Sequence, residues 1–432
     1  MAQKYLYIET YGCQMNDYDS QRIKNAIGIP QTNDPGKADI VIINTCAIRE
    51  KADQKALSSL GKFKHLKKSN PNLIVGMTGC VAQLYGDKLL SKASHLDFVL
   101  GPRAIPKLAE IINDVEIERT RIVETSYDIE EPFEILPYHE NEKVTSFLSI
   151  QQGCNKNCTY CIVPTVRGKE INRPLNDIMS EARYLVQKGV KEITLIGQTV
   201  NSWKNDGLKF ADLLNIVGEL ESLERIRFTT SYPRDFTKKL INTMKTNPKV
   251  CSHIHLPVQS GSNEVLSKMK RTYTVEWYME VVTRLKEEIA DMAISSDIIV
   301  GFPGETRQDF EQTLKLVEEV EFDTCFSFKY SPRPGTPAAS MTDFIDSETA
   351  GRRLSILHEL QRKITCKKNE DRIDRIEQVL VEGKSKNDPS HLMGRTSQNR
   401  IVNFSSSDNL CGKLVNVKIN NGFQNSLLGS IL

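Results

Sequence analysis

The stretch Gly153-Cys154-Asn155-Lys156-Asn157-Cys158-Thr159-Tyr160-Cys161 follows a short apolar segment, Phe147 to Gln151, that we predict to be a β-strand. Three thiols within eight residues can converge on one soft metal centre. A structural zinc site normally has four ligands, and neither a fourth Cys nor a His lies nearby. An iron–sulfur cluster held by three thiolates keeps one iron free for an outside ligand. The spacing therefore favours such a cluster over zinc or incidental cysteines.

The region around this stretch predicts an incomplete β/α barrel. Six strand candidates alternate with helix-like segments, and barrels of this type carry their chemistry at the carboxyl ends of the strands. The candidates are Phe147 to Gln151, Glu192 to Ile196, Arg225 to Thr230, His253 to Val258, Ile294 to Val300 and Cys325 to Tyr330. The cysteine stretch therefore follows the first strand, at the end of the barrel where an active site is expected.

The first part of the chain predicts a separate α/β domain with a parallel sheet, because short apolar runs alternate with helix-like stretches. The runs are Tyr5 to Ile8, Ile40 to Ile43, Leu73 to Val75 and Phe98 to Leu100. Cys13, Cys46 and Cys80 each follow one of them. Since the carboxyl ends of parallel strands lie at one edge, these thiols can meet there. A second three-thiolate cluster and simple buried cysteines are both compatible with this spacing.

A lysine-rich segment lies between two of these cysteines. The range Ala47 to Leu66 is predicted to be a helix with an apolar face. That face consists of Ala52, Ala56, Leu60, Phe63 and Leu66. Residues 51–70 hold six Lys and one Asp, so the other face could contact phosphate or could simply be solvated. The candidates for phosphate contacts are Lys55, Lys62, Lys64, Lys67 and Lys68.

The sequence divides into three predicted domains and a linker. Residues 124–142 carry seven acidic residues and no Lys or Arg, which predicts a linker between residues 1–123 and 143–369. A charged helix is predicted from Asp346 to about Arg375, and residues 370–432 predict a small five-stranded barrel. Its strand and turn candidates are Gln378 to Glu382, Ile401 to Phe404, Lys413 to Ile419 and the turn Asn421-Gly422.

Composition excludes several classes of protein. The 432 residues are 39% hydrophobic and 26% charged with a net charge of +2, which is typical of a globular chain and not of a disordered one. No segment is apolar enough to span a membrane, and the first residues lack a signal-peptide pattern, so we expect a cytoplasmic protein. Ten cysteines in that compartment point to metal or redox chemistry, not to disulfides. Cys251, Cys325, Cys366 and Cys411 have no comparable context and receive no ligand role.

Together these motifs resemble the methylthiotransferase family of radical S-adenosylmethionine enzymes over nearly the whole chain. The resemblance implies an auxiliary 4Fe–4S cluster held by Cys13, Cys46 and Cys80. It implies a second 4Fe–4S cluster, which binds S-adenosylmethionine, on Cys154, Cys158 and Cys161. Later segments that also look like the family are candidates for lining the cofactor pocket. They are Leu195 to Gln198, Asn201, His255 to Gly261, Asp297 to Glu305 and Arg333 to Thr336.

The last domain resembles the TRAM domain, an RNA-binding fold, and includes Gly394-Arg395-Thr396 and Asn399. Residues 367–432 contain ten Lys and Arg against seven Asp and Glu, a mild excess that permits RNA contact. Aromatic side chains that could stack on bases are sparse there, at Phe404 and Phe423. A purely structural cap is the alternative.

The branch of the family is indicated by Gly12 to Asn16 and Asn44 to Ala52, which look like the MiaB-type branch. That branch methylthiolates carbon 2 of isopentenyladenosine beside the anticodon of tRNA. The resemblance implies a deoxyadenosyl radical that abstracts the hydrogen, sulfur from the auxiliary cluster, and a methyl group from a second S-adenosylmethionine. The expected partners are tRNA, an unidentified electron donor and a sulfur source, with no membrane, and we expect a monomer.

Three other functions stay open at this point. Sister branches methylthiolate threonylcarbamoyladenosine in tRNA or an aspartate of a ribosomal protein. A protein of another class, a non-catalytic iron–sulfur or zinc protein that binds RNA through its last domain, would hold metal without radical turnover.

Overall fold

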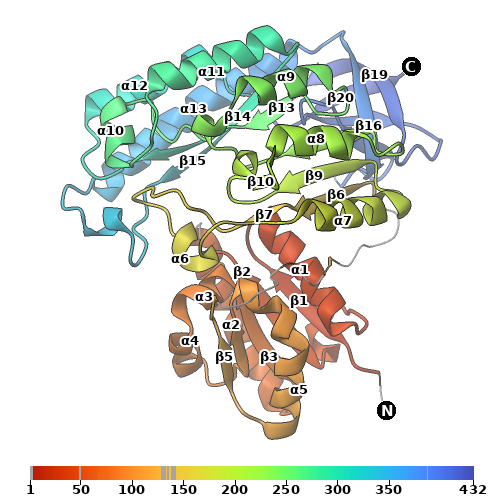
Figure 1. Ribbon diagram of the computed structural model, residues 1–432, viewed down its shortest axis with the longest axis vertical. Coiled ribbons are helices and arrows are strands. Elements are labelled where there is room, and N and C mark those ends of the chain that lie inside the picture. The colour runs from red at the N-terminus through yellow and green to blue at the C-terminus, as the bar shows by residue number, and fades with distance from the viewer. Residues whose placement is uncertain (1–2, 48–49, 128–132, 134–135, 138–142, 387) are drawn as a thin grey trace. The chain divides into compact units, whose positions relative to one another are not determined.

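The computed structural model describes the chain apart from residues 1–2, 48–49, 128–132, 134–135, 138–142 and 387 (Figure 1). Backbone contacts divide the chain into two compact units. The first consists of Met1–Glu140, Gln152–Lys156 and Cys161–Arg173, and the second of Asn141–Gln151, Asn157–Tyr160 and Pro174–Leu432. The predicted linker lies largely outside the described residues, and the predicted domain limits stay a prediction.

The first unit contains the predicted parallel sheet. Five strands pair in sequence order, and all pairs are parallel. They are β1 (Leu6–Thr10), β2 (Ile40–Thr45), β3 (Ile74–Gly79), β4 (Phe98–Leu100) and β5 (Ile122–Glu124). The sequence analysis missed β5, because three half-buried residues beside an acid-rich segment give too short an apolar signal.

Helices cover both faces of this sheet. They are α1 (Gln14–Ile27), α2 (Glu50–Ser69), α3 (Cys80–Tyr85), α4 (Asp87–Lys92), α5 (Leu108–Glu118) and α6 (Val163–Arg167). Successive strand side chains point to opposite faces, so Ile40 and Ile42 pack with α1 and α5, while Val41 and Ile43 pack with α2 and α3. The strands are therefore buried on both sides, as a parallel sheet requires. Ala52, predicted on the apolar face of α2, is among the residues whose side chains are not described.

The second unit contains the predicted incomplete barrel. Its six main strands are all parallel and follow sequence order in two three-stranded pieces. They are β6 (Thr145–Ser149), β9 (Glu192–Ile196), β12 (Arg225–Phe228), β13 (His253–His255), β14 (Ala293–Val300) and β15 (Thr324–Lys329). A parallel bridge between Ile226 and Val250 joins the two pieces. Two-residue strands of this unit are β10 (Lys204–Asn205) and β11 (Leu208–Lys209), whereas β8 (Ile171–Asn172) belongs to the first unit and β7 (Gln151–Gln152) has one residue in each.

Helices follow the barrel strands, and several of them begin at residues that favour helix starts. They are α7 (Leu175–Gln187), α8 (Phe210–Gly218), α9 (Lys238–Thr246), α10 (Asn263–Lys268), α11 (Val275–Glu288), α12 (Arg307–Val320) and α13 (Ser347–Glu370). The side chains of Thr274, Thr306 and Asp346 accept backbone N–H groups at the starts of α11, α12 and α13. The long helix predicted from Asp346 is therefore confirmed, with Asp346 as its cap. No helix in the described ranges is both long and apolar enough to cross a membrane.

The chain ends in a closed five-stranded barrel, as predicted. Its strands pair in the order β16 (Ile376–Lys384), β17 (His391–Arg395), β18 (Ile401–Ser405), β20 (Leu427–Ile431) and β19 (Leu414–Gly422). The predicted turn at Asn421-Gly422 is wrong, because both residues pair with β20 after a register shift at Ile419. The bulge moves the reversal to residues 423–426.

The small barrel is attached to the amino-terminal ends of the large barrel's strands. Arg225 and Arg227, in β12, donate to the backbone carbonyls of Arg395, Ser397 and Thr396 at 2.6, 3.0 and 3.2 Å. The Gly394-Arg395-Thr396 segment that resembles the TRAM domain therefore contributes its backbone to this attachment.

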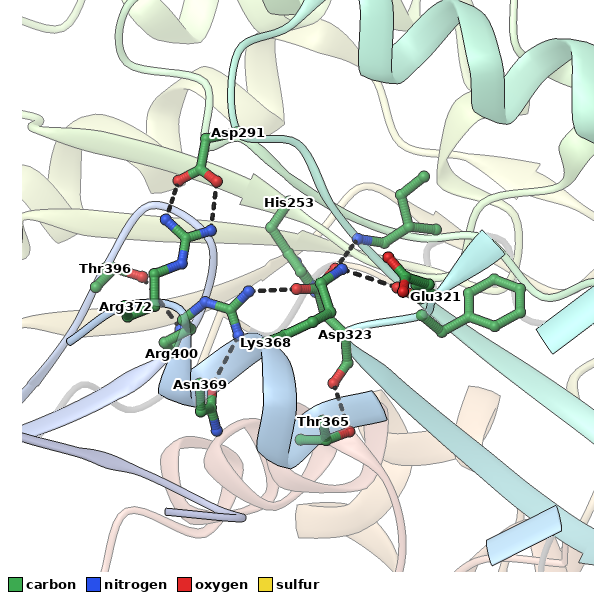
Figure 2. Close-up of polar contacts among 12 residues, drawn as sticks. His253, Asp291, Glu321, Asp323, Thr365, Lys368, Asn369, Arg372, Thr396 and Arg400 are labelled. Carbon is green, nitrogen blue, oxygen red and sulfur yellow. Dashed lines mark hydrogen bonds and ion pairs between the residues drawn. The ribbon is translucent and has the colours of Figure 1, made fainter. Parts of the chain in front are cut away.

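A buried carboxylate just before β15 completes the attachment (Figure 2). Asp323 pairs with Arg400 from the small barrel and with Lys368 from α13, the latter at 2.9 Å. Its second role is to accept the backbone N–H of Ile294 at 3.0 Å. Asp291 forms a separate ion pair with Arg372. These contacts tie the small barrel to the end of the large barrel that lies opposite the carboxyl-end loops.

Candidate metal centres and catalytic site

The first unit brings Cys13, Cys46 and Cys80 to one edge of its sheet. Cys13 precedes α1 after β1, Cys46 directly follows β2, and Cys80 opens α3 at the end of β3. A Cβ placed on Gly12 would lie 2.7 Å from the Cβ of Cys46, so the first two loops are packed together. The fold therefore places the three cysteine loops at the carboxyl edge of the sheet, and the role of their thiols as cluster ligands stays a prediction.

Two buried asparagines fix the first two cysteine loops. Asn16 accepts hydrogen bonds from the backbone N–H of Cys13 at 3.3 Å and from its thiol at 3.4 Å. The Asn16 amide nitrogen donates to Asn44 Oδ1 at 3.0 Å and to the carbonyl of Thr45 at 2.9 Å. Asn44 in turn donates to the Asn16 carbonyl at 2.8 Å. The sequence motifs contain both asparagines, but sequence reasoning assigned them no role.

The three thiols share one electrostatic environment. A hydrogen bond with Cys46 lowers the pKa of the Cys13 thiol to about 6 against the effect of burial, and Arg167 adds to the lowering. Burial raises the pKa of the Cys80 thiol, while Arg167 acts in the opposite direction. The guanidinium Nε of Arg167 donates to Cys80 Sγ at 3.3 Å. One cation therefore acts on two of the three thiols.

Arg167 is held by a buried ion pair that the sequence analysis did not find. Its Nη1 lies 2.8 Å from Asp19 Oδ2, and both side chains are 2% exposed. Its backbone carbonyl accepts a hydrogen bond from Arg103 at 3.0 Å. No sequence signal pairs Arg167 with Cys80, because the two residues are 87 positions apart.

These residues fit an iron–sulfur cluster. Thiols are the ligands that such clusters use, and Nη2 of Arg167 is buried without an acceptor in the part of the chain that is described. Cluster sulfide would provide an acceptor. Among the described residues, no three His, Cys, Asp or Glu side chains are arranged to hold a metal ion as they stand. The fit therefore rests on the donor chemistry and the unsatisfied guanidinium.

The barrel cysteines are divided between the two units. In the first unit, Cys154 accepts the backbone N–H of Lys156 at 3.4 Å and donates its own N–H to the Gly168 carbonyl at 3.1 Å. Gly153 has φ of 79°, and a Cβ there would lie 2.2 Å from the carbonyl of Lys169, so only glycine fits. Cys161 is half-buried.

In the second unit, Cys158 accepts a hydrogen bond from Arg271 Nη1 at 3.4 Å. The neighbouring Thr159 is anchored to α10, since its hydroxyl donates to the Lys268 carbonyl at 2.9 Å. Hydrogen bonds to ligand sulfur are typical of iron–sulfur sites, so Cys154 and Cys158 both fit the predicted role.

Three polar side chains of the later motif segments have partners within the protein. His255 lies 3.1 Å from Ser295 Oγ and 3.2 Å from Asp297 Oδ2, so both ring nitrogens have partners. Asn201 exchanges two hydrogen bonds with the backbone of Tyr232, at 2.8 and 2.9 Å. Glu305 accepts the Gly301 N–H at 2.8 Å, and burial raises the pKa of its carboxyl. Whether these segments line a cofactor pocket stays a prediction.

The lysines of α2 fall into two groups. Lys62 pairs with Glu9 at 3.3 Å, and Lys67 pairs with Asp97. Within the described ranges, no ion pair joins Lys55, Lys64 or Lys68 to a carboxylate, and these three side chains are exposed. The second group is therefore the better candidate for phosphate contacts.

Three segments of the chain match known protein families. Residues 5–101 match the Uncharacterized protein family UPF0004, residues 148–317 the Radical SAM superfamily, and residues 374–432 the TRAM domain. The fold of a radical S-adenosylmethionine methyltransferase, TsrM, from Kitasatospora setae is similar, with a TM-score of 0.59 at 13% identity over 78% of this chain and 75% of that chain.

Two curated relatives extend over almost the whole chain. A tRNA-2-methylthio-N(6)-dimethylallyladenosine synthase from Neisseria gonorrhoeae (strain NCCP11945) is 44% identical over 439 residues, 99% of each chain. Its counterpart from Haemophilus influenzae (strain PittGG) is 43% identical over 441 residues, 100% of this chain and 93% of the relative.

The fold, the cysteine motif and these matches define a radical S-adenosylmethionine enzyme, a class that uses S-adenosylmethionine and a 4Fe–4S cluster. The chain belongs to the family of tRNA-2-methylthio-N(6)-dimethylallyladenosine synthases.

Proposed function

We propose that this enzyme inserts sulfur at carbon 2 of N(6)-dimethylallyladenosine beside the anticodon of tRNA and then methylates that sulfur. We place it in the cytoplasm, where its thiols stay reduced. The observation that carries the proposal is the convergence of Cys13, Cys46 and Cys80 in one environment, in addition to the barrel cysteines. A radical enzyme that only breaks a C–H bond has no need of a second thiolate site.

In this proposal Cys154, Cys158 and Cys161 hold the cluster that binds S-adenosylmethionine, and Cys13, Cys46 and Cys80 hold an auxiliary 4Fe–4S cluster. When bound, these groups supply one-electron chemistry and sulfur for an unactivated C–H position that acid–base groups cannot attack. Asn16 and Asn44 keep the first two auxiliary loops in place, and Arg167 supplies positive charge beside Cys80. The chain's own residues thus orient and stabilise the sulfur ligands.

In this proposal the tRNA contacts both the small barrel and the carboxyl-end loops of the large barrel. Strand β14 has eight residues, which corresponds to about 26 Å between the small barrel at one end and the carboxyl-end loops at the other. A substrate that contacts both ends must extend over about this length. A tRNA can do so, and its anticodon-loop bases can be turned outward at less cost than bases in a duplex.

The decisive experiment is mass spectrometry of tRNA nucleosides from a host that lacks its own methylthiolating enzyme, with and without this gene. We expect the 2-methylthio derivative of dimethylallyladenosine with the native chain and with Cys411→Ala, which changes an exposed cysteine outside both sites. Cys13→Ala and Cys158→Ala should each abolish it.

Other outcomes would contradict the proposal in different ways. A product on threonylcarbamoyladenosine alone would retain the enzyme class and refute the substrate. If expressed protein with filled clusters left every tRNA nucleoside unchanged, tRNA would be excluded as the substrate, and methylthiolation of a ribosomal-protein aspartate would be tested next.

A further inference from the structure

Arg271 places a guanidinium directly on a sulfur of the barrel cysteine motif. Its Nη1 donates to Cys158 Sγ at 3.4 Å, Nη2 donates to the Pro257 carbonyl at 3.0 Å, and Nε donates to the Tyr273 hydroxyl at 2.8 Å. The donors therefore point in three fixed directions. The contact spans 113 positions of sequence, and nothing in the cysteine motif itself indicates it.

Two aromatic rings hold the guanidinium in place. Its central carbon lies 4.6 Å from the ring centroid of Tyr232 and 5.1 Å from that of Tyr273, within the range of cation–π contact. Both tyrosines are buried, with 6% and 5% of their surface exposed. The Tyr273 hydroxyl is itself anchored to the carbonyls of Pro257 and Val258, each at 3.1 Å. The orientation of Arg271 toward Cys158 is thus set before any cofactor binds.

The charge of Arg271 has no carboxylate counterpart among the described residues. Burial raises the pKa of Tyr273 to about 12, so that hydroxyl is neutral and supplies no negative charge. Arg167 provides an internal comparison, because it also donates to a cysteine thiol but is paired with Asp19 at 2.8 Å. The barrel site therefore receives the full charge of Arg271, whereas Asp19 compensates part of the charge that Arg167 brings to Cys80.

We propose that Arg271 is a positioning residue that raises the reduction potential of the cluster held by Cys154, Cys158 and Cys161. The inference rests on the proposed ligand role of these cysteines. The reduced cluster carries one more negative charge than the oxidised cluster, and a cationic N–H donor at a ligand sulfur stabilises the more negative state. Arg271 remains protonated throughout, since arginine does not titrate in proteins. A low-potential one-electron reductant gives one electron to the cluster, and no bond is formed or broken.

The test measures that potential directly in full-length protein. The auxiliary site is removed by Cys13→Ala, Cys46→Ala and Cys80→Ala together, so that one cluster remains and its spectrum is not overlapped. The fraction of reduced cluster is followed by electron paramagnetic resonance during titration with dithionite and redox mediators. Iron and sulfide are quantified for every variant, so that loss of the cluster is distinguished from a change in its potential.

In this background Arg271→Met should lower the ratio of reduced to oxidised cluster about tenfold at a fixed solution potential. This change corresponds to a reduction potential that is lower by about 59 mV for a one-electron couple. Arg271→Lys keeps the charge and should show a smaller fall. Arg234→Met is the matched control, because Arg234 stacks on Trp277 at 5.2 Å without contacting a cysteine. The reduction potential of the cluster in Arg234→Met should equal that of the parent protein. The difference in reduction potential between Arg271→Met and the parent should be the same at pH 7 and pH 9.

An unchanged potential in Arg271→Met with full iron content overturns the inference, as does an equal shift in Arg234→Met. Should Arg271→Met not retain iron, Arg271→Gln, which keeps an N–H donor without the charge, decides by the same criterion. Should neither neutral variant retain iron, Arg271→Lys decides: a potential close to the parent's supports the role of charge, and a fall of tenfold or more refutes it. A background variant that binds no iron contradicts the ligand assignment, and the proposed function fails together with the inference.

Discussion

Substituting Asp323 by Ala should weaken the attachment of the small barrel to the large barrel and destabilise the second unit. The Asp323 side chain is 9% exposed and compensates Arg400, which is 8% exposed. It also accepts the Ile294 N–H and pairs with Lys368 (Figure 2). Removing one partner of a buried ion pair leaves the other charge uncompensated and costs about 3–5 kcal/mol. We therefore expect the free energy of unfolding to fall by that amount.

Tryptophan fluorescence isolates this effect. Both tryptophans of the chain, Trp203 and Trp277, lie in the second unit, and Trp203 is 1% exposed. With a urea dependence of roughly 2–3 kcal/mol per molar, the midpoint of unfolding should fall by about 1–2 M. Glu311→Ala is the control, since its pair with Arg307 is exposed and should change stability by no more than about 1 kcal/mol. A midpoint for Asp323→Ala within 0.2 M urea of native protein, roughly 0.5 kcal/mol at that slope, would refute the reasoning.

Three further predictions concern the sites and the pH range. Cys13→Ala should retain reductive cleavage of S-adenosylmethionine, measured as deoxyadenosine, while producing no methylthio nucleoside; loss of both activities would contradict the separation of the two sites. Burial lowers the pKa of His253 well below its usual value. Below about pH 6.5 the unfolded chain therefore binds a proton that the folded chain does not, and stability falls by up to about 1.4 kcal/mol per pH unit. His253→Gln should flatten this slope in urea titrations from pH 7 to pH 5, and an unaltered slope would exclude His253 as its source. Lys64→Glu with Lys68→Glu should weaken tRNA binding and reduce its salt dependence in filter-binding assays. Lys62→Glu should weaken binding less, because the native Lys62 ammonium already pairs with Glu9. Equal losses of affinity would argue against the division of the α2 lysines into paired and unpaired groups.

Sequence patterns predicted the long regular elements well, because buried strands and amphipathic helices have strong periodic signals. Strand β9 occupies Glu192–Ile196, as predicted, and the other five barrel strands begin or end within a few residues of their predicted limits. The misses have local causes. The three-residue β5 is too short to detect, and a bulge carries β19 through Asn421-Gly422, which otherwise has the composition of a turn.

The cysteine trios were identified from spacing and resemblance, but their supporting arginines were not. Cys154, Cys158 and Cys161 are close in sequence, so their spacing predicts a common role. Arg167 and Arg271 reach their thiols across 87 and 113 positions. The sequence around an arginine does not indicate which buried group will bind and orient its side chain.

The sequence alone therefore determined the fold class and the family and predicted the two cysteine sets, since periodicity and short-range spacing are local properties of the chain. Only the tertiary structure decided which charges act on the cysteine sulfurs and where the small barrel is attached. The Gly394-Arg395-Thr396 segment illustrates the difference: its residues are readable in the sequence, but its backbone contacts with Arg225 and Arg227 exist only after the two barrels pack. Electrostatic contacts of this kind depend on distance in space, and the order of residues does not record that distance.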